Sequence, residues 1–266
     1  MELPDYRHIL FGQSPLALVV GQVRFSPQPG FTEGTALAAF AKRLRADYPK
    51  SERIEQLQLS VSPMHGMEHQ AGPMLWKFSS VDDNWSAVLA ENALTLEVRG
   101  GYSSINEFLE RFSSLLDHLI EELDPGLQTR VGLRYIDEFR YDGASTITDW
   151  ATLIRPELLG FAIMAEGLFG NSPISHTRQQ IEVTRPDGTL MIRHGLLSGT
   201  SVEPIADRIP QQGRFYLLDM DYYNVQPQRI DRTAIIATMQ RYNDTLYRFF
   251  RWIMLDKLYE SLEPQK

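Results

Sequence analysis

The chain has 266 residues, of which 43% are hydrophobic and 11% aromatic, and its net charge is −8 at pH 7. A chain of this size buries roughly 70–75% of the surface that its unfolded form exposes, so it can build a large core without a metal or a disulfide. The absence of cysteine excludes disulfides, thiolate metal sites and thiol nucleophiles. The acidic net charge argues against nucleic acid as the main ligand.

The N-terminal residues "MELPDYRHILFGQ" lack the basic start and apolar run of a secretory signal. No segment reaches the roughly 20 apolar residues that are needed to cross a bilayer. We therefore expect a cytoplasmic protein that does not bind a membrane.

The first hundred residues show strand patterns and one helix pattern. A helix is predicted over 31–49, where apolar residues recur at helical spacing, Thr32 is placed to cap the start and Pro49 ends the pattern. A loop rich in Met, Gly and Pro, "SPMHGMEHQAGPM", is predicted over 62–74. Strands are predicted at 16–26, 54–62, 75–81, 85–91 and 93–100.

The clearest element is a helix over 103–126. Ser104 and Glu107 have the spacing of a capping box, and Asp124-Pro125-Gly126 ends the pattern. Phe108, Phe112 and Leu116 belong to one wide apolar stripe. We expect this stripe to rest on a sheet that includes the next strand, 129–141.

The second half repeats the theme of antiparallel strands followed by a helix. The predicted elements are a helix at 146–160 that is interrupted or bent at Pro156, a hairpin at 178–195 that turns at Asp187-Gly188, a strand at 213–225 and a long helix at 231–262. This order predicts an α+β fold in which long helices pack on one face of an antiparallel sheet. One compact domain over 1–266 and two similar packed halves, 1–142 and 143–266, both fit it.

The stretch "TRVGLRYIDEFRY" (129–141) places a carboxylate among apolar residues. Asp137 shares the face of Val131 and Tyr135, whereas Arg134 and Glu138 share the other face. Asp137 is either a ligand-binding carboxylate or a salt-bridged residue near the strand's end. Arg134 and Asp137 could meet only across a bulge, so Arg134 with Glu138 is the easier pair.

Asp219 and Asp221 in "LLDMDYY" share one strand face and could hold a divalent cation, although a solvated strand edge explains them as well. Together with Arg134, Asp137 and Glu138, they are the candidate ligand-binding residues. We predict no catalytic residue and no metal site.

The motif "HGMEH" (65–69) matches the H-x-x-E-H zinc motif, which requires a helix. Pro63, Gly66 and Gly72-Pro73 disfavour a helix, so an exposed non-helical loop is predicted instead. The alternative function is a metal-dependent hydrolase that uses His65, Glu68 and His69, or Asp219 and Asp221.

His194 at the end of "TLMIRH" could act as a general base. However, the chain contains no G-x-S-x-G elbow, Walker loop or G-x-G-x-x-G motif. We therefore expect a protein that binds a protein partner or a small ligand, without a cofactor and without recognisable catalytic machinery.

The last helix carries aromatic residues on more than one side, including Phe249, Phe250 and Trp252. A helix that is apolar on two sides packs against two surfaces, and aromatic residues are favoured at interfaces. The pattern predicts a homodimer formed through this helix, with burial in the chain's own core as the alternative.

An ordered set of segments carries a resemblance to a known family. The set comprises "PLALVVGQVRF", "LWKFSS", "LTLEVRGGYSSINEF", "RVGLRYID" and a "W…I.PELLG" segment, and it spans most of the first 160 residues. In this order the segments resemble a sporadically distributed family of uncharacterised bacterial proteins, which more often has Asn where this chain has Asp137. The resemblance implies a bacterial cytoplasmic protein and an accessory or antitoxin-like role in a defence or mobile-element gene cluster. It assigns no catalytic residue.

Overall fold

The computed structural model describes residues 3–28, 31, 34–62, 66–170, 172–198 and 213–265, with the side chains of 55–74 outside the description. The helices of this part are α1 (Thr35–Leu44), α2 (Ile105–Leu123), α3 (Ile147–Trp150), α4 (Pro156–Leu159), α5 (Ala162–Leu168), α6 (Arg232–Ile253) and α7 (Asp256–Ser261). The strands are β1 (Leu16–Phe25), β2 (Lys50–Ser62), β3 (Gly66–Ser79), β4 (Trp85–Ala90), β5 (Ala93–Val98), β6 (Leu127–Phe139), β7 (Gln179–Arg185), β8 (Gly188–Ser198), β9 (Arg214–Asn224) and β10 (Gln228–Arg229).

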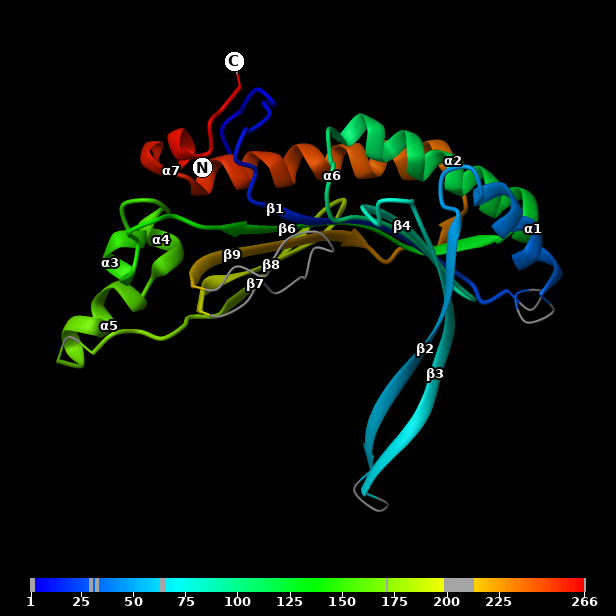
Figure 1. Cartoon of the computed structure of the whole chain (residues 1–266), viewed down its shortest axis with the longest axis horizontal. Helices are drawn as coiled ribbons and strands as arrows, with labels where there is room; N and C mark the ends of the chain where they lie inside the picture. The colour runs from blue at the N-terminus through cyan, green and yellow to red at the C-terminus, as the bar shows by residue number, and fades with distance from the viewer. Residues whose placement is uncertain are drawn as a thin grey trace. The chain divides into compact units, whose positions relative to one another are not determined.

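The described strands follow the order β2-β3-β4-β5-β1-β6-β9-β8-β7, and β10 pairs with β6. The pairs β2–β3, β3–β4, β4–β5, β7–β8 and β8–β9 are antiparallel. Figure 1 shows strands and helices of a mixed α+β fold, which confirms this coarser part of the predicted fold class.

The chain divides into two compact units. The central unit comprises Val20–Gly132 and Asn224–Met239, and the terminal unit comprises Met1–Val19, Leu133–Tyr223 and Gln240–Lys266. Each unit therefore combines segments that are distant in the sequence. A split into two similar halves near residue 142 stays a prediction.

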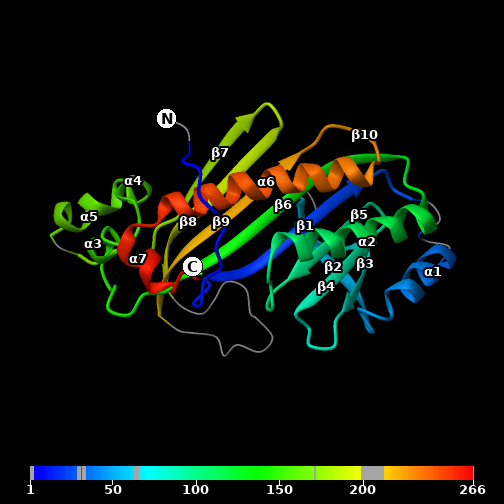
Figure 2. The ribbon, with the colours of Figure 1, turned by 90° about the horizontal axis from the view of Figure 1, so that it is seen from above.

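In the central unit, α2 covers one face of the strands (Figures 1 and 2). The Ser104 hydroxyl accepts a hydrogen bond from the backbone N–H of Glu107 (3.2 Å), which confirms the predicted start of this helix. Phe108 and Phe112 are fully buried, and a Cβ atom placed on Gly21 would lie 2.8 Å from the Phe108 ring. The apolar stripe of α2 therefore rests directly on β1.

In the terminal unit, α6 packs on the strands through aromatic residues. The Tyr135 hydroxyl donates to Asn243 Oδ1 (2.9 Å), and Tyr222 stacks on Tyr242 with 4.0 Å between ring centroids. Tyr135 and Tyr222 therefore face α6. Because successive strand residues alternate between faces, Arg134 and Asp219 lie on the opposite face.

The predicted helix 231–262 is interrupted after Ile253. The carbonyl of Ile253 accepts a hydrogen bond from the N–H of Arg155 (3.0 Å), and the N–H of Leu255 donates to the carbonyl of Leu153 (2.9 Å). These bonds to a distant segment replace the helical bonds, and α7 then starts as a separate helix.

The predicted loop 62–74 is wrong for Ser62, which ends β2, and for residues 66–74, which belong to β3. Ser62 pairs with Gly66, so β2 and β3 form one long hairpin, and the register shifts between Glu55 and Leu57, opposite Gly72-Pro73. A proline is tolerated in a strand at such an irregularity. Glycine and proline in "GMEHQAGPM" therefore concealed a strand.

Two smaller predictions also change. The helix predicted over 146–160 is two short helices, and Pro156 is the first residue of α4. Gly34 is the N-cap residue of α1, whereas Thr32 lies outside the described residues. In the part of the chain described above, no helix has the length and apolar character that spanning a membrane requires.

Candidate functional site

Two of the predicted site residues meet on the face of the terminal unit opposite α6. Arg134 donates from Nε to Asp219 Oδ1 (2.7 Å) and from Nη2 to Asp219 Oδ2 (2.9 Å). Arg193 donates from Nη1 to the same Oδ2 (3.2 Å). Asp219 is only 4% exposed, whereas both guanidinium groups are partly exposed. A buried carboxylate is therefore held by two arginines from the neighbouring strands β6 and β8.

The other acidic residues of this face have different positions. Glu138 is paired with Arg140 (3.3 Å), and the Arg140 guanidinium lies over the Phe215 ring, 4.6 Å from its centroid. Asp221 follows Asp219 on the same face of β9 and is half-buried. The structure thus joins Arg134 with Asp219, a pair that no local pattern in the sequence indicates.

This arrangement bears on the cation site considered for Asp219 and Asp221. Both Asp219 oxygens already accept hydrogen bonds from guanidinium groups, so a cation would have to displace two arginines. Within the described ranges, no group of three or more histidine, aspartate and glutamate side chains is arranged to hold a metal. The geometry of Asp219 is that of a structural ion pair.

Asp137 lies on the other face, toward α6, and is only 3% exposed. Asp137 lies three residues from Arg134 in β6, so strand alternation places the two side chains on opposite faces and they do not form one ligand site. Burial raises the pKa of the Asp137 carboxyl to about 8. Asp137 is thus a core residue that is protonated at neutral pH rather than a surface ligand.

His194 is also buried. Its Nδ1 lies 2.7 Å from the Tyr216 hydroxyl, while Nε2 has no hydrogen-bond partner in the described part of the chain. Burial lowers the pKa of His194, which favours the neutral ring. A general base must reach a substrate, and this imidazole is enclosed in the core.

The "HGMEH" motif has no helical backbone where it is described. Glu68 and His69 belong to β3, and His65 lies outside the described residues. The zinc motif needs its histidines one helical turn apart. The backbone of 66–69 therefore does not have the geometry of that motif.

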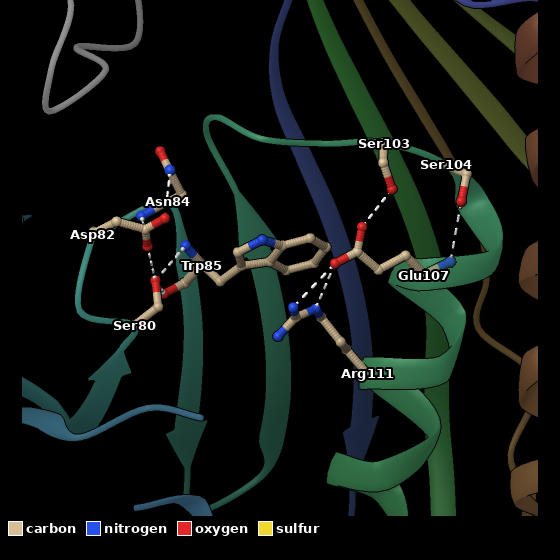
Figure 3. Close-up of polar contacts among 8 residues, drawn as sticks. All are labelled: Ser80, Asp82, Asn84, Trp85, Ser103, Ser104, Glu107 and Arg111. Carbon is tan, nitrogen blue, oxygen red and sulfur yellow. Dashed lines mark hydrogen bonds and ion pairs between the residues drawn. The ribbon is translucent and has the colours of Figure 1, made fainter. Parts of the chain in front are cut away.

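A polar network fixes the start of α2 in the central unit (Figure 3). The Glu107 carboxylate accepts hydrogen bonds from the Ser103 hydroxyl and from Arg111 Nε (3.1 Å), and the bond from Ser103 is the main cause that lowers the Glu107 pKa. The Arg111 guanidinium lies over the Trp85 ring, 4.5 Å from its centroid. These groups bind one another, which is the pattern of a structural cap.

Among the described residues, four large apolar side chains are exposed on α5 and the residues that flank it in the terminal unit. Phe161, Met164, Leu168 and Phe169 are each 62–67% exposed, while Ala162 and Ala165 are buried. The first three recur at i, i+3 and i+7, so they line one side of the helix. We call these four residues the α5 ridge.

The sequence contained a signal for this ridge that was not used. In "FAIMAEGLF" the large side chains recur at helical spacing, and the alanines occupy the other side. Amphipathic patterns normally place the large apolar side inside. Here the structure buries Ala162 and Ala165 and leaves the large residues exposed.

The aromatic residues of α6 are more enclosed than those of the ridge. Phe250 is buried and stacks on Phe139 with 5.7 Å between centroids. Phe249 stacks on Trp252 (5.7 Å), and the Arg155 guanidinium lies over the Trp252 ring (4.8 Å). The chain's own residues cover much of this surface, so the homodimer stays a prediction.

Comparison of the chain with protein-family models and with curated proteins finds no match.

Proposed function

We propose that the protein acts by binding a protein partner through the α5 ridge and that it does so without catalytic machinery. The observation that supports this is the exposure of four adjacent large apolar side chains on one short segment. Single exposed apolar residues are common on protein surfaces, but a contiguous group marks an interaction site. Aromatic and methionine side chains are also enriched at the centre of protein interfaces.

The free energy available from the ridge is sufficient for an anchor. Fully burying one large apolar side chain stabilises a complex by about 1.5–3 kcal/mol. A few such residues usually dominate an interface. The ridge would therefore form the centre of the interface, with polar residues around it.

Charge at the rim favours a different protein over a second copy of this chain. Glu166 is the only charged residue of α5, and Glu157 is exposed in the adjacent α4. A symmetric dimer through the ridge would bring these acids near their own copies, and both chains carry a net charge of −8. The partner expected here has an apolar surface that is rimmed by lysine or arginine.

Site-specific photocrosslinking tests this proposal. A benzophenone amino acid replaces Phe161 or Leu168 in the full chain, and Val81, a lone apolar residue that is 75% exposed, is the control position. The chains with benzophenone at 161 and at 168 should both crosslink to the same partner protein. The crosslinked peptide of that partner should contain apolar and basic residues. Met164→Glu should abolish these crosslinks while changing stability by less than about 0.5 kcal/mol.

Two results would contradict the proposal. Adducts of twice the chain's own mass would show that the occupant is a second copy. Equal adducts from position 81 would show that the benzophenone group reacts without a specific interface.

Several further expectations are retained as proposals. They are membership of the bacterial family described above, a cytoplasmic location and a fold of two similar halves. Self-association through Phe249, Phe250 and Trp252 is independent of the ridge, and light scattering of the purified chain measures it directly.

A further inference from the structure

Two arginines of the central unit converge on one neutral side chain. Arg24 donates from Nε to Gln22 Oε1 (3.0 Å), and Arg130 donates from Nη1 to the same oxygen (3.1 Å). Gln22 Nε2 donates to the Thr95 hydroxyl (3.1 Å). The amide orientation is therefore determined, because a reversed amide would point its N–H groups at two cations.

These residues lie on the face of the central unit opposite α2. Gly21 faces Phe108 of α2, so its neighbour Gln22 and then Arg24 point away from this helix. By the same alternation, the described residues of this face include the cations Arg24, Lys50, Lys77, Arg99 and Arg130 and the acids Glu52 and Glu97. Glu97 is paired with Arg99 (3.3 Å). Among the described residues of this face, cations outnumber acids, although the net charge of the chain is −8.

Gly132 makes room for the Arg130 guanidinium. A Cβ atom at Gly132 would lie 2.6 Å from Arg130 Nη1 and 2.9 Å from its Cζ. The guanidinium therefore lies against the backbone of β6, and any side chain at 132 would move it. Its position next to Gln22 depends on this glycine.

The terminal unit shows which acceptor such an arginine pair binds when the acceptor belongs to the chain itself. There, Arg134 and Arg193 converge on the carboxylate of Asp219. In the central unit the shared acceptor is a neutral amide, and in the described part of the chain Arg24 has no carboxylate partner. A phosphate oxyanion beside Arg24 would supply the negative charge that the Gln22 amide lacks.

A second observation points to a polar ligand on the same face. Gln128 precedes Arg130 by two residues, so both side chains lie on one face of β6. It is 1% exposed, and neither atom of its amide has a hydrogen-bond partner among the described residues. Buried amide groups are normally satisfied, so the Gln128 amide has hydrogen-bonding capacity that the described residues do not use.

We propose that Gln22, Arg24 and Arg130 form a binding site for the phosphate group of a small ligand. A phosphate carries up to two negative charges and offers several oxygens to two guanidinium groups, whereas a carboxylate carries one charge. The face lacks the exposed aromatic side chains on which nucleic acid bases stack, among the residues described. This site belongs to the central unit and does not depend on the function proposed for the α5 ridge.

Isothermal titration of the full chain with pyrophosphate and with inorganic phosphate at low ionic strength tests the site. Saturable binding is expected, and Arg24→Gln should weaken it by about tenfold or more, because one charge-assisted contact is lost. Gly132→Ala should weaken it as well, although it changes no charge. Arg232→Gln is the control, since it removes an exposed arginine of the same unit that is paired with Asp117 (2.8 Å).

Each outcome decides the proposal. Loss of binding in Arg24→Gln and Gly132→Ala, with binding kept in Arg232→Gln, supports it. Equal weakening in Arg232→Gln would show that only the general charge attracts the anion. Absence of saturable pyrophosphate binding overturns the proposal. This holds even if the chain binds an oligonucleotide, because the proposed ligand is a small phosphate compound.

Discussion

The two arginine pairs of this protein differ in one group. In the terminal unit, Arg134 and Arg193 meet on the carboxylate of Asp219, and in the central unit, Arg24 and Arg130 meet on the amide of Gln22. A carboxylate neutralises a guanidinium, so the first pair can serve the fold alone. The Gln22 amide oxygen orients its donors but brings no negative charge to the exposed Arg24. The comparison teaches that the acceptor, rather than the arginines, separates a structural pair from a candidate binding pair.

A second carboxylate sharpens the comparison within the terminal unit. Asp219 is held by two cations, whereas Asp137 is buried with no ion pair among the described residues. The pKa of Asp137 is raised to about 8, so between pH 4 and pH 8 the folded chain holds a proton that the unfolded chain has released. Stability therefore falls as the pH rises through this window.

The largest expected effect is that of Asp137→Asn. The variant should gain stability relative to the wild type by up to about 1.4 kcal/mol per pH unit from pH 4 to pH 8, and the gain should level off above pH 8. Urea unfolding at a series of pH values measures the difference. Asp47→Asn, which alters an exposed carboxyl, is the matched control. A gain that is independent of pH would show that Asp137 is ionised in the fold.

The next prediction concerns the α2 side of the central unit. Phe112 is fully buried and stacks on Phe108 with 6.4 Å between centroids. Phe112→Ala should lower the free energy of unfolding by about 3–5 kcal/mol, because it leaves a cavity in the core. A melting temperature of Phe112→Ala within a degree or two of the wild type would show that α2 does not cover the strands of the central unit. The two faces of that unit could then not be distinguished as a covered face and an open face.

The smallest effect compares the two pairs directly. Arg134→Ala leaves the buried Asp219 with one cation and should cost about 1–3 kcal/mol of stability, given that Arg134 is itself partly exposed. Arg24→Ala should change stability by less than about 0.5 kcal/mol, since Arg24 is exposed and its acceptor is neutral. Equal losses in the two variants would show that both pairs serve the fold.

Local chemistry determined several elements of the fold. Ser104 caps α2 as its spacing to Glu107 predicts, and Asp124 ends the helix with a φ of 44°. Asp187-Gly188 forms the predicted hairpin turn, where Arg185 pairs with Gly188. These signals act between residues that are close in the chain, so the sequence alone was sufficient to find them.

The candidate sites depended on partners that the sequence does not place together. Arg134 and Asp219 are 85 positions apart and meet because β6 lies beside β9. Alternation along β6 correctly put Asp137 on the apolar face, but it could not tell whether a charged partner would reach that face. Strand order is a property of the whole sheet, and no local pattern encodes it.

The α5 ridge shows the same division between sequence and tertiary structure. The spacing of Phe161, Met164 and Leu168 is visible in the sequence, and this spacing alone determines that they share one side of a helix. Which side points outward was decided by packing, because the unit buries Ala162 and Ala165 instead. Burial of a side chain depends on the space between neighbouring elements, and only the tertiary structure determines this space.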